Sequence, residues 1–516
     1  MKFSGTKYYL LTLLILCFTF LSPLIYSQNI SINRKLQTKI LKGLDETYKF
    51  NFKRSERIFD KIIKQYPGNP AGFHFKSIPY LWRFLDNKND SDKVVFDALS
   101  DSVTEKSLVF LETNPDDPFI NFILGSTYFY RAMAAVRRES YLDVVWTTKK
   151  SFSYLDKSLA VDSSFYDAYL GLGLYNFMVA QTPPALKWAM DITGISGDAD
   201  TGMKYLKLAG QNGVFAKVAA EFYLSQILSE FYQDYNQANS ILTRLNKKYS
   251  KNLLFNYSLA LLKIKMKDFR KAERILKKII LNKDTSFVQL KSYSNLSMGN
   301  IHFYKNEFDT AKYFYTNFLS NSTDNYFKGI AALRLGICYF VSGDTVSSQQ
   351  YFELSDRGNS DIDDDRFASV TGEKFAENLP DTLQLKFIFI RNLIKSGKYK
   401  IAYDSLRSIE DSSLTNVNYI AKKNLLLSDV YFNLDSITQS YNRAIFAAKP
   451  DDTEKWIKPF AYYYAARASF AGSDISNAEL LIEQAEEYKD YFYENDLNNS
   501  LNALKENIKR LKKENP

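Results

Sequence analysis

Few side chains in this sequence could carry out catalysis or bind a metal ion. The only histidines, His74 and His302, lie far apart in helical patterns with aromatic neighbours, and Cys338 is the only cysteine after Cys17. A catalytic group usually has an activating partner, and a zinc site has four ligands at short spacings. We therefore expect these residues to lie in the core or a groove. We expect no enzyme activity, no cofactor and no metal.

An acidic stretch resembles the beginning of a calcium-binding loop but departs from it at two positions. Asp361, Asp363 and Asp365 alternate as ligands would, yet Arg366 stands where the loop needs glycine and Gly372 where it needs a bidentate glutamate. The sequence also has no glycine-rich phosphate loop and no nucleophile elbow. The stretch predicts a solvated acidic loop rather than a metal site.

The composition favours a mostly helical chain with a large core. Hydrophobic residues make up 46% and aromatic residues 16% of the 516 positions, with only 20 glycines and 12 prolines. So few helix breakers indicate long stretches of helix. The formal net charge of +9 suits an acidic surface better than nucleic acid as a partner, although a mixed, solvated surface would show the same mild excess.

Residues 1–27 are expected to be a secretory signal peptide. Lys2 and Lys7 precede an apolar run over residues 8–21, which at about 14 residues is short for a membrane-spanning helix. Ile25-Tyr26-Ser27 is a plausible cleavage site before Gln28. We expect a periplasmic or extracellular protein; the alternative is a chain tethered to the membrane by an uncleaved N-terminal segment.

Small residues that serve as anchors recur along the chain. Successive anchors are 34, 39, 37, 54, 38 and 38 residues apart, and they are Ala238, Ala272, Ala311, Ser348, Ala402, Ser440 and Ala478. Twelve residues before several anchors lies a second small residue: Gly299, Gly336, Ser428 and Ala466. Two helices can approach closely where both carry small side chains, so this spacing predicts a series of helical hairpins.

The pattern resembles the tetratricopeptide repeat (TPR), most clearly at 335-LGICY-339 followed by Ser348 and Phe352. The spacings exceed the usual 34 residues and few late prolines are present. The resemblance implies an all-α fold, an α-solenoid (superhelix) of about ten degenerate TPR-like hairpins with a concave groove, as in secreted TPR proteins of bacterial type.

Two places interrupt the repeat and suggest a division of the chain. We expect an N-terminal TPR superhelix over 28–355, an acidic polar loop or hinge over 356–380, and a C-terminal TPR block with a capping helix over 381–516. Between Tyr128 and Ser151 the gap is 23 residues where the repeat needs nine, which predicts an unusually long first helix in that hairpin.

A third interruption, over residues 177–202, is strongly apolar. Its sequence predicts a short helix over 182–193, inserted between the two helices of one hairpin. Leu186, Trp188 and Met190 are its tentative contact residues. We expect this insertion to plug or narrow the groove; contact with a partner or lipid, and plain surface exposure, remain alternatives.

The groove itself would present Tyr293, Asn300 and Phe303 from one hairpin and Phe340 from the next. Adaptor-type TPR domains hold a terminal carboxylate with Lys and Asn, and only Asn300 suits that role. The groove is therefore expected to receive apolar or aromatic segments, or to be filled.

These features predict a non-enzymatic protein–protein interaction scaffold or adaptor outside the cytoplasm, which docks a segment of a protein or peptide partner. One alternative is an envelope assembly factor whose apolar insertion contacts lipid or polymer, with peripheral membrane contact. Another is a non-catalytic subunit of a larger enzyme or transport complex. No nucleic-acid partner is expected.

Overall fold

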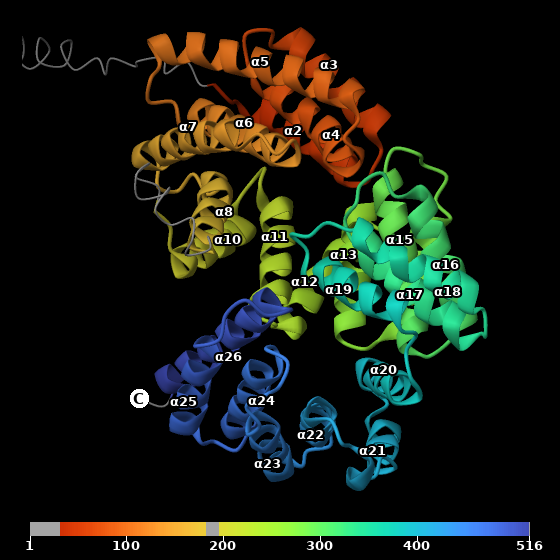
Figure 1. The fold of residues 1–516 in the computed structure, drawn as a ribbon. Helices are drawn as coiled ribbons and strands as arrows, with labels where there is room; N and C mark the ends of the chain where they lie inside the picture. Colours follow the sequence, from red (N-terminus) through yellow and green to blue (C-terminus); the bar gives the residue numbers. More distant parts are fainter. Residues whose placement is uncertain (1–30, 182–195, 515–516) are drawn as a thin grey trace, which may run out of the picture.

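The computed structural model describes residues 31–181 and 196–514 (Figure 1). The expected signal peptide over 1–27 lies outside these ranges, and so does the expected inserted helix with Leu186, Trp188 and Met190. Within the ranges, none of the helices combines the length and the apolar character that crossing a bilayer requires.

The described residues form helices and connecting turns, with no strand among them, which confirms the predicted all-α class. The first half contains α2 (Arg34–Tyr48), α3 (Phe52–Gln65), α4 (Ala71–Asn87), α5 (Asp90–Thr113), α6 (Pro118–Arg137), α7 (Tyr141–Val161), α8 (Ala168–Ala180), α10 (Ala199–Asn212), α11 (Lys217–Glu230), α12 (Tyr235–Lys248) and α13 (Leu253–Lys265). The second half contains α14 (Phe269–Ile280), α15 (Val288–Tyr304), α16 (Phe308–Asn321), α17 (Lys328–Val341), α18 (Thr345–Glu353), η1 (Leu354–Arg357), α19 (Asp363–Glu377), α20 (Thr382–Lys395), α21 (Tyr399–Arg407), η2 (Asp411–Ser413), α22 (Val417–Asn433), α23 (Ile437–Ala448), α24 (Ile457–Ala471), α25 (Ile475–Glu486) and α26 (Glu494–Glu514).

The anchors predicted from the spacing hold the hairpins together. All seven are fully buried in the second helix of a hairpin. In two units the small residue of the first helix meets an aromatic ring four positions after the anchor. A Cβ at Gly299 would lie 2.7 Å from the Tyr315 ring, and one at Gly336 would lie 2.6 Å from the Phe352 ring. Small residues are therefore needed where the two helices cross, as the pattern indicated.

The turn inside each hairpin needs one residue in the left-handed region. This residue lies five positions before the anchor in every one of the seven units. It is glycine in two of them, Gly343 (φ 85°) and Gly397 (φ 75°). The other five have positive φ without glycine: Gln233, Lys267, Asn306, Asp435 and Ser473. Glycine adopts this conformation without steric cost, so five units accept some strain to close the turn.

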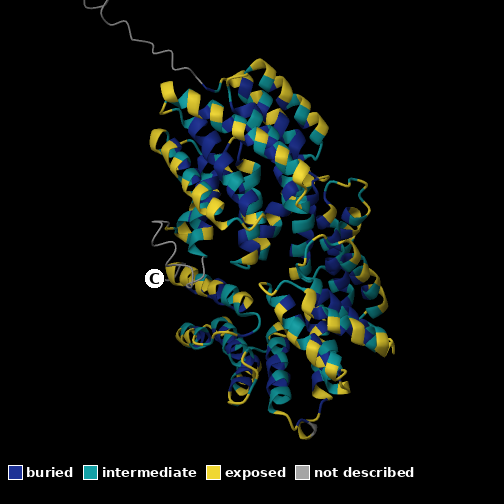
Figure 2. Ribbon diagram, turned by 45° about the horizontal axis from the view of Figure 1, so that its top comes forward, coloured by how far each residue is buried: buried dark blue, intermediate teal, exposed yellow. Residues whose placement is uncertain are grey.

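The hairpins stack side by side, and the solenoid curls back on itself (Figure 1). Buried residues line the helix sides that pack together, and exposed residues follow the outer sides (Figure 2). At the N-terminal end, the Asp86 carboxylate accepts hydrogen bonds from the backbone N–H groups of Gln289 (3.1 Å) and Leu290 (2.9 Å). These two hydrogen bonds join α4 to the start of α15, about 200 residues further along the chain.

The C-terminal helix closes the arrangement from the other end. One side of α26 buries Leu497, Leu501, Leu504 and Ile508 in the cluster formed with α24 and α25. Its other side reaches the N-terminal half, where Ser500 Oγ accepts from Gln233 Nε2 (2.8 Å) and Lys509 pairs with Asp200 (2.7 Å). The predicted capping helix therefore also bridges two distant parts of the chain.

The acidic stretch differs from the loop expected over 356–380, because most of it forms α19. Asp365 points inward and is buried. Its carboxylate accepts from the backbone N–H groups of Phe327 (2.7 Å), Ile330 (2.9 Å) and Asn359 (2.9 Å). The loop interpretation was wrong here, because three backbone donors compensate the buried charge. The division of the chain into two superhelical blocks stays a prediction.

Candidate partner-binding surface

The hairpin formed by α6 and α7 is elongated, and the extra length is shared between its helices. Helix α6 continues twelve residues beyond Gly125, whereas α15 continues five beyond Gly299. Helix α7 begins ten residues before Ser151, whereas α16 begins three before Ala311. Each helix is thus seven residues longer, which is about 10 Å of helix. The predicted long first helix is present as α6, but half of the extra length lies in α7.

The elongated part of α7 exposes a set of large apolar side chains. Tyr141 is 75% exposed, Leu142 87% and Trp146 61%, and Val145 beside them is also exposed. We call these four residues the α7 apolar face. Residues 141–150 include no buried side chain, and α7 is anchored only from Ser151 onward. Their positions i, i+1, i+4 and i+5 put all four on one side of the helix. Contiguous exposed apolar residues mark interaction sites more often than isolated ones.

Positive charges border the α7 apolar face. Arg138 and Lys149 are exposed, and neither forms an ion pair within the described residues. Lys150 Nζ lies 5.0 Å from the centroids of both the Trp146 and the Tyr128 rings. A segment that covers the apolar face therefore gains from acidic residues at its edges.

The tip of this hairpin is held in place by its neighbours. Arg137 donates a hydrogen bond to the backbone oxygen of Asp86 at the end of α4 (3.1 Å). The same guanidinium lies 3.5 Å from the carboxylate of Asp324, in the turn before α17. These two contacts hold the end of α6, and with it the α7 apolar face, against neighbouring elements.

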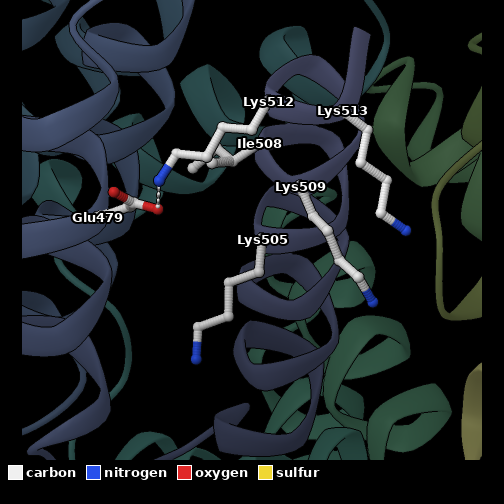
Figure 3. A pocket seen from close by; sticks show the side chains of 6 residues that line it. All are labelled: Glu479, Lys505, Ile508, Lys509, Lys512 and Lys513. Atoms are coloured by element: carbon white, nitrogen blue, oxygen red, sulfur yellow. Dashed lines mark hydrogen bonds and ion pairs between the residues drawn. The ribbon is translucent and has the colours of Figure 1, made fainter. Parts of the chain in front are cut away.

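Apart from the α7 apolar face, a hollow lies between α25 and α26 (Figure 3). It has a volume of about 370 Å³ and is lined by Glu479, Lys505, Ile508, Lys509, Lys512 and Lys513. Three of its lysines already pair with carboxylates: Lys505 with Glu486 (2.6 Å), Lys509 with Asp200 (2.7 Å) and Lys512 with Glu479 (2.6 Å). These ion pairs hold α26 against its neighbours. The charges of the three lysines are therefore already compensated within the chain, which disfavours this hollow as a binding site for an anionic ligand.

The groove residues predicted from the sequence are largely engaged within the chain. The Tyr293 hydroxyl donates to the Asp324 carboxylate (3.1 Å). Asn300 Oδ1 accepts from the Tyr315 hydroxyl (2.9 Å) and from Arg334 (2.6 Å). Phe303 is only 4% exposed, so its assignment as a contact residue was wrong and it belongs to the core.

Phe340 is half-buried, and its role in binding stays a prediction. The sequence did indicate the region of the α7 apolar face, through the 23-residue gap that contains Trp146. Its exposure could not be read from the spacing.

The residues considered for chemistry have packing roles. His74 and Cys338 are buried, and burial lowers the pKa of His74 to about 3 and raises that of the Cys338 thiol. His302 stacks on Phe314 and pairs with Glu307 (2.6 Å). Across the described residues, no three His, Cys, Asp or Glu side chains gather as a metal site would require.

Stacked hairpins with small residues at each crossing define an α-solenoid of helical repeats. Residues 134–375, slightly less than half of the chain, match the family model described as Iml2/Tetratricopeptide repeat protein 39. The match and the hairpin geometry both support a TPR-like superfamily. No curated protein matches the chain.

Three solved structures match the chain at low identity. The yeast Tom70 structure has 14% identity over 93% of this chain and 96% of its own, with a TM-score of 0.26. The TPR domain of P58(IPK) has 14% identity over 74% and 99%, with a TM-score of 0.21. The APC/C hetero-tetramer Cut9-Hcn1 has 14% identity over 89% and 87%, with a TM-score of 0.26. At these TM-scores the likeness does not extend to the overall arrangement of the hairpins.

Proposed function

We propose that this protein is a non-catalytic scaffold that docks a segment of a partner protein on the α7 apolar face. The observation that carries the proposal is the exposure of Tyr141, Leu142 and Trp146 side by side on a supported helix. Leaving large apolar side chains in water forgoes about 1.5–3 kcal/mol for each, which a partner would recover by covering them. The TPR-like fold agrees with a scaffold role.

The partner segment is an amphipathic helix with acidic residues beside its apolar side. The partner helix would carry apolar side chains at i, i+3, i+4 and i+7, which lie on one side of a helix. These side chains would pack against the α7 apolar face. Arg138 and Lys149 would meet the acidic residues and raise the rate of association. We also propose that the scaffold acts outside the cytoplasm, from the character of residues 1–27; mass spectrometry should then find mature chains that begin at Gln28.

Site-specific photo-crosslinking in extract of the native host tests the docking surface. A crosslinker at Leu142 should capture a defined protein band, and one at Leu281 should not, although Leu281 is also 69% exposed. Trp146→Glu should weaken this band at least tenfold, and Leu281→Glu should leave it unchanged. The same bands from both positions, or a band that Trp146→Glu does not weaken, would exclude the α7 apolar face as the docking site.

A further inference from the structure

A small cavity lies between helices of the N-terminal hairpins. It has a volume of about 30 Å³. The residues that matter for its chemistry come from α2, α4, α6, α8 and the turn before α11: Tyr48, His74, Phe122, Tyr130, Gly171 and Phe215. Its walls are mostly aromatic, and they include the imidazole ring of His74 from α4.

The hydrogen bonds around His74 determine which ring nitrogen carries the proton. The Thr127 hydroxyl donates its only hydrogen to the backbone oxygen of Ile123 (2.8 Å). The same hydroxyl oxygen lies 2.8 Å from His74 Nδ1, and both contacts are hydrogen bonds only if the hydroxyl accepts from Nδ1–H. His74 Nδ1 therefore carries the hydrogen, and Nε2 presents a lone pair.

His74 Nε2 has no hydrogen-bond donor within the described residues. The side chain is only 1% exposed, and its ring stacks on Tyr130 with the centroids 5.2 Å apart and the planes 7° apart. Burial also lowers the pKa of His74 to about 3, so the ring is neutral at physiological pH. A buried acceptor without a donor is unfavourable, and such groups in folded proteins are usually satisfied by ordered water.

Two further polar groups lie in the same region. They are the hydroxyls of Tyr48 and Tyr130, and burial raises the pKa of both. Both residues line the cavity. An acceptor on His74 and two hydroxyls, which can donate or accept, supply the two to four polar contacts that an internal water needs.

We propose that this cavity is an internal water site, in which a water molecule donates a hydrogen bond to His74 Nε2 and is held by the Tyr48 or Tyr130 hydroxyl. A water needs at least about 10–15 Å³, so the cavity holds one or two waters and excludes any ring-sized organic ligand. The water would link hairpins that contribute α2, α4 and α6, and it would satisfy the polar groups inside an aromatic core.

Nitrogen-15 NMR of histidine-labelled full-length protein tests the site. The chain has only two histidines, and His302→Gln assigns the remaining signals to His74 without touching the cavity. We expect the Nδ1–H tautomer, a Nε2 shift moved from the free lone-pair value toward the protonated one, and cross-peaks from water to the ring protons. A Nε2–H tautomer, a free lone-pair shift, or the absence of water cross-peaks would overturn the proposal.

A second variant separates the water from the fold. Tyr130→Phe removes one hydroxyl but keeps the stacked ring. It should preserve the Nδ1–H tautomer, which Thr127 imposes, and shorten the residence time of the water at Nε2. If the shift of Nε2 and the water cross-peaks are unchanged in Tyr130→Phe and in the matching Tyr48→Phe variant, neither hydroxyl holds the water and the proposed site is wrong.

Discussion

Replacing Gly336 by alanine should destabilise the hairpin of α17 and α18. The added Cβ would lie 2.6 and 2.7 Å from two ring carbons of Phe352 and 3.1 Å from the backbone oxygen of Ser348. Phe352 is 1% exposed, so its ring has little room to move. Overpacking of this kind costs about 1–3 kcal/mol. Alanine also favours a helix over glycine by about 1 kcal/mol, which opposes the collision.

Gly210→Ala in α10 is the matched control, because it makes the same chemical change inside a helix with room for the methyl group. The nearest atom to a Cβ at Gly210 is Glu221 Cγ, at 3.5 Å, which is an ordinary contact. Gly210→Ala should therefore be neutral or stabilising by up to about 1 kcal/mol. The free energies of unfolding of the two variants should differ by about 1–3 kcal/mol, the cost of the collision alone.

The assay must be local, because repeat arrays unfold in parts as well as globally. Hydrogen exchange should show faster exchange in peptides from α17 and α18 of Gly336→Ala, and unchanged or slower exchange in peptides from α10 of Gly210→Ala. Urea titrations supply the accompanying free energies. Equal changes in free energy of unfolding and in local protection for Gly336→Ala and for Gly210→Ala would refute the view that close approach at Gly336 fixes the hairpin.

Two further predictions concern pH and closure of the solenoid. Burial lowers the pKa of His74 to about 3 from its ordinary 6.5, so between these values the unfolded chain binds a proton that the folded chain does not. His74 therefore contributes a fall in stability of up to about 1.4 kcal/mol per pH unit on acidification, opposed by Asp86 and Asp167, whose pKa burial raises to about 6. The native chain should lose more stability than His74→Gln between pH 6 and pH 4, and His302→Gln, the control, should follow the native chain. The double variant Lys509→Glu/Arg510→Glu breaks contacts of α26 with Asp200 (2.7 Å) and Asp234 (4.0 Å), so small-angle scattering should show a larger radius of gyration. Lys513→Glu, whose side chain has no ion pair in the described part of the chain, should leave it unchanged, and equal radii for both variants would contradict the bridging role of α26.

The sequence determined the hairpins, because their requirement is local. A small residue is needed wherever two helices cross closely, and Ala311 or Ser348 marks that place without knowledge of the rest of the fold. The turn residue of each hairpin was harder to predict from the sequence. Lys267 and Ser473 adopt the left-handed conformation that glycine adopts in other units, so residue type alone did not reveal the shared turn position.

The sequence could not predict which way the side chains of the candidate sites point. Phe303 and Trp146 are both aromatic residues in helices, yet one is buried and the other is 61% exposed. Periodicity says which residues share a side of a helix but not which side meets a neighbour. Asp365 was misread for a related reason. Its acidic surroundings suggested solvent, whereas three backbone N–H groups from other segments hold it inside.

Only the tertiary structure decided which distant segments of the solenoid meet. Gln233 and Ser500 are 267 positions apart, and Asp200 and Lys509 are 309 apart. Each hairpin contacts its neighbours with a small rotation, and the curvature of the whole is the sum of these rotations. No single repeat encodes that sum, so the sequence specifies the unit and its packing residues, while closure by α26 and the exposure of the α7 apolar face follow from the accumulated geometry.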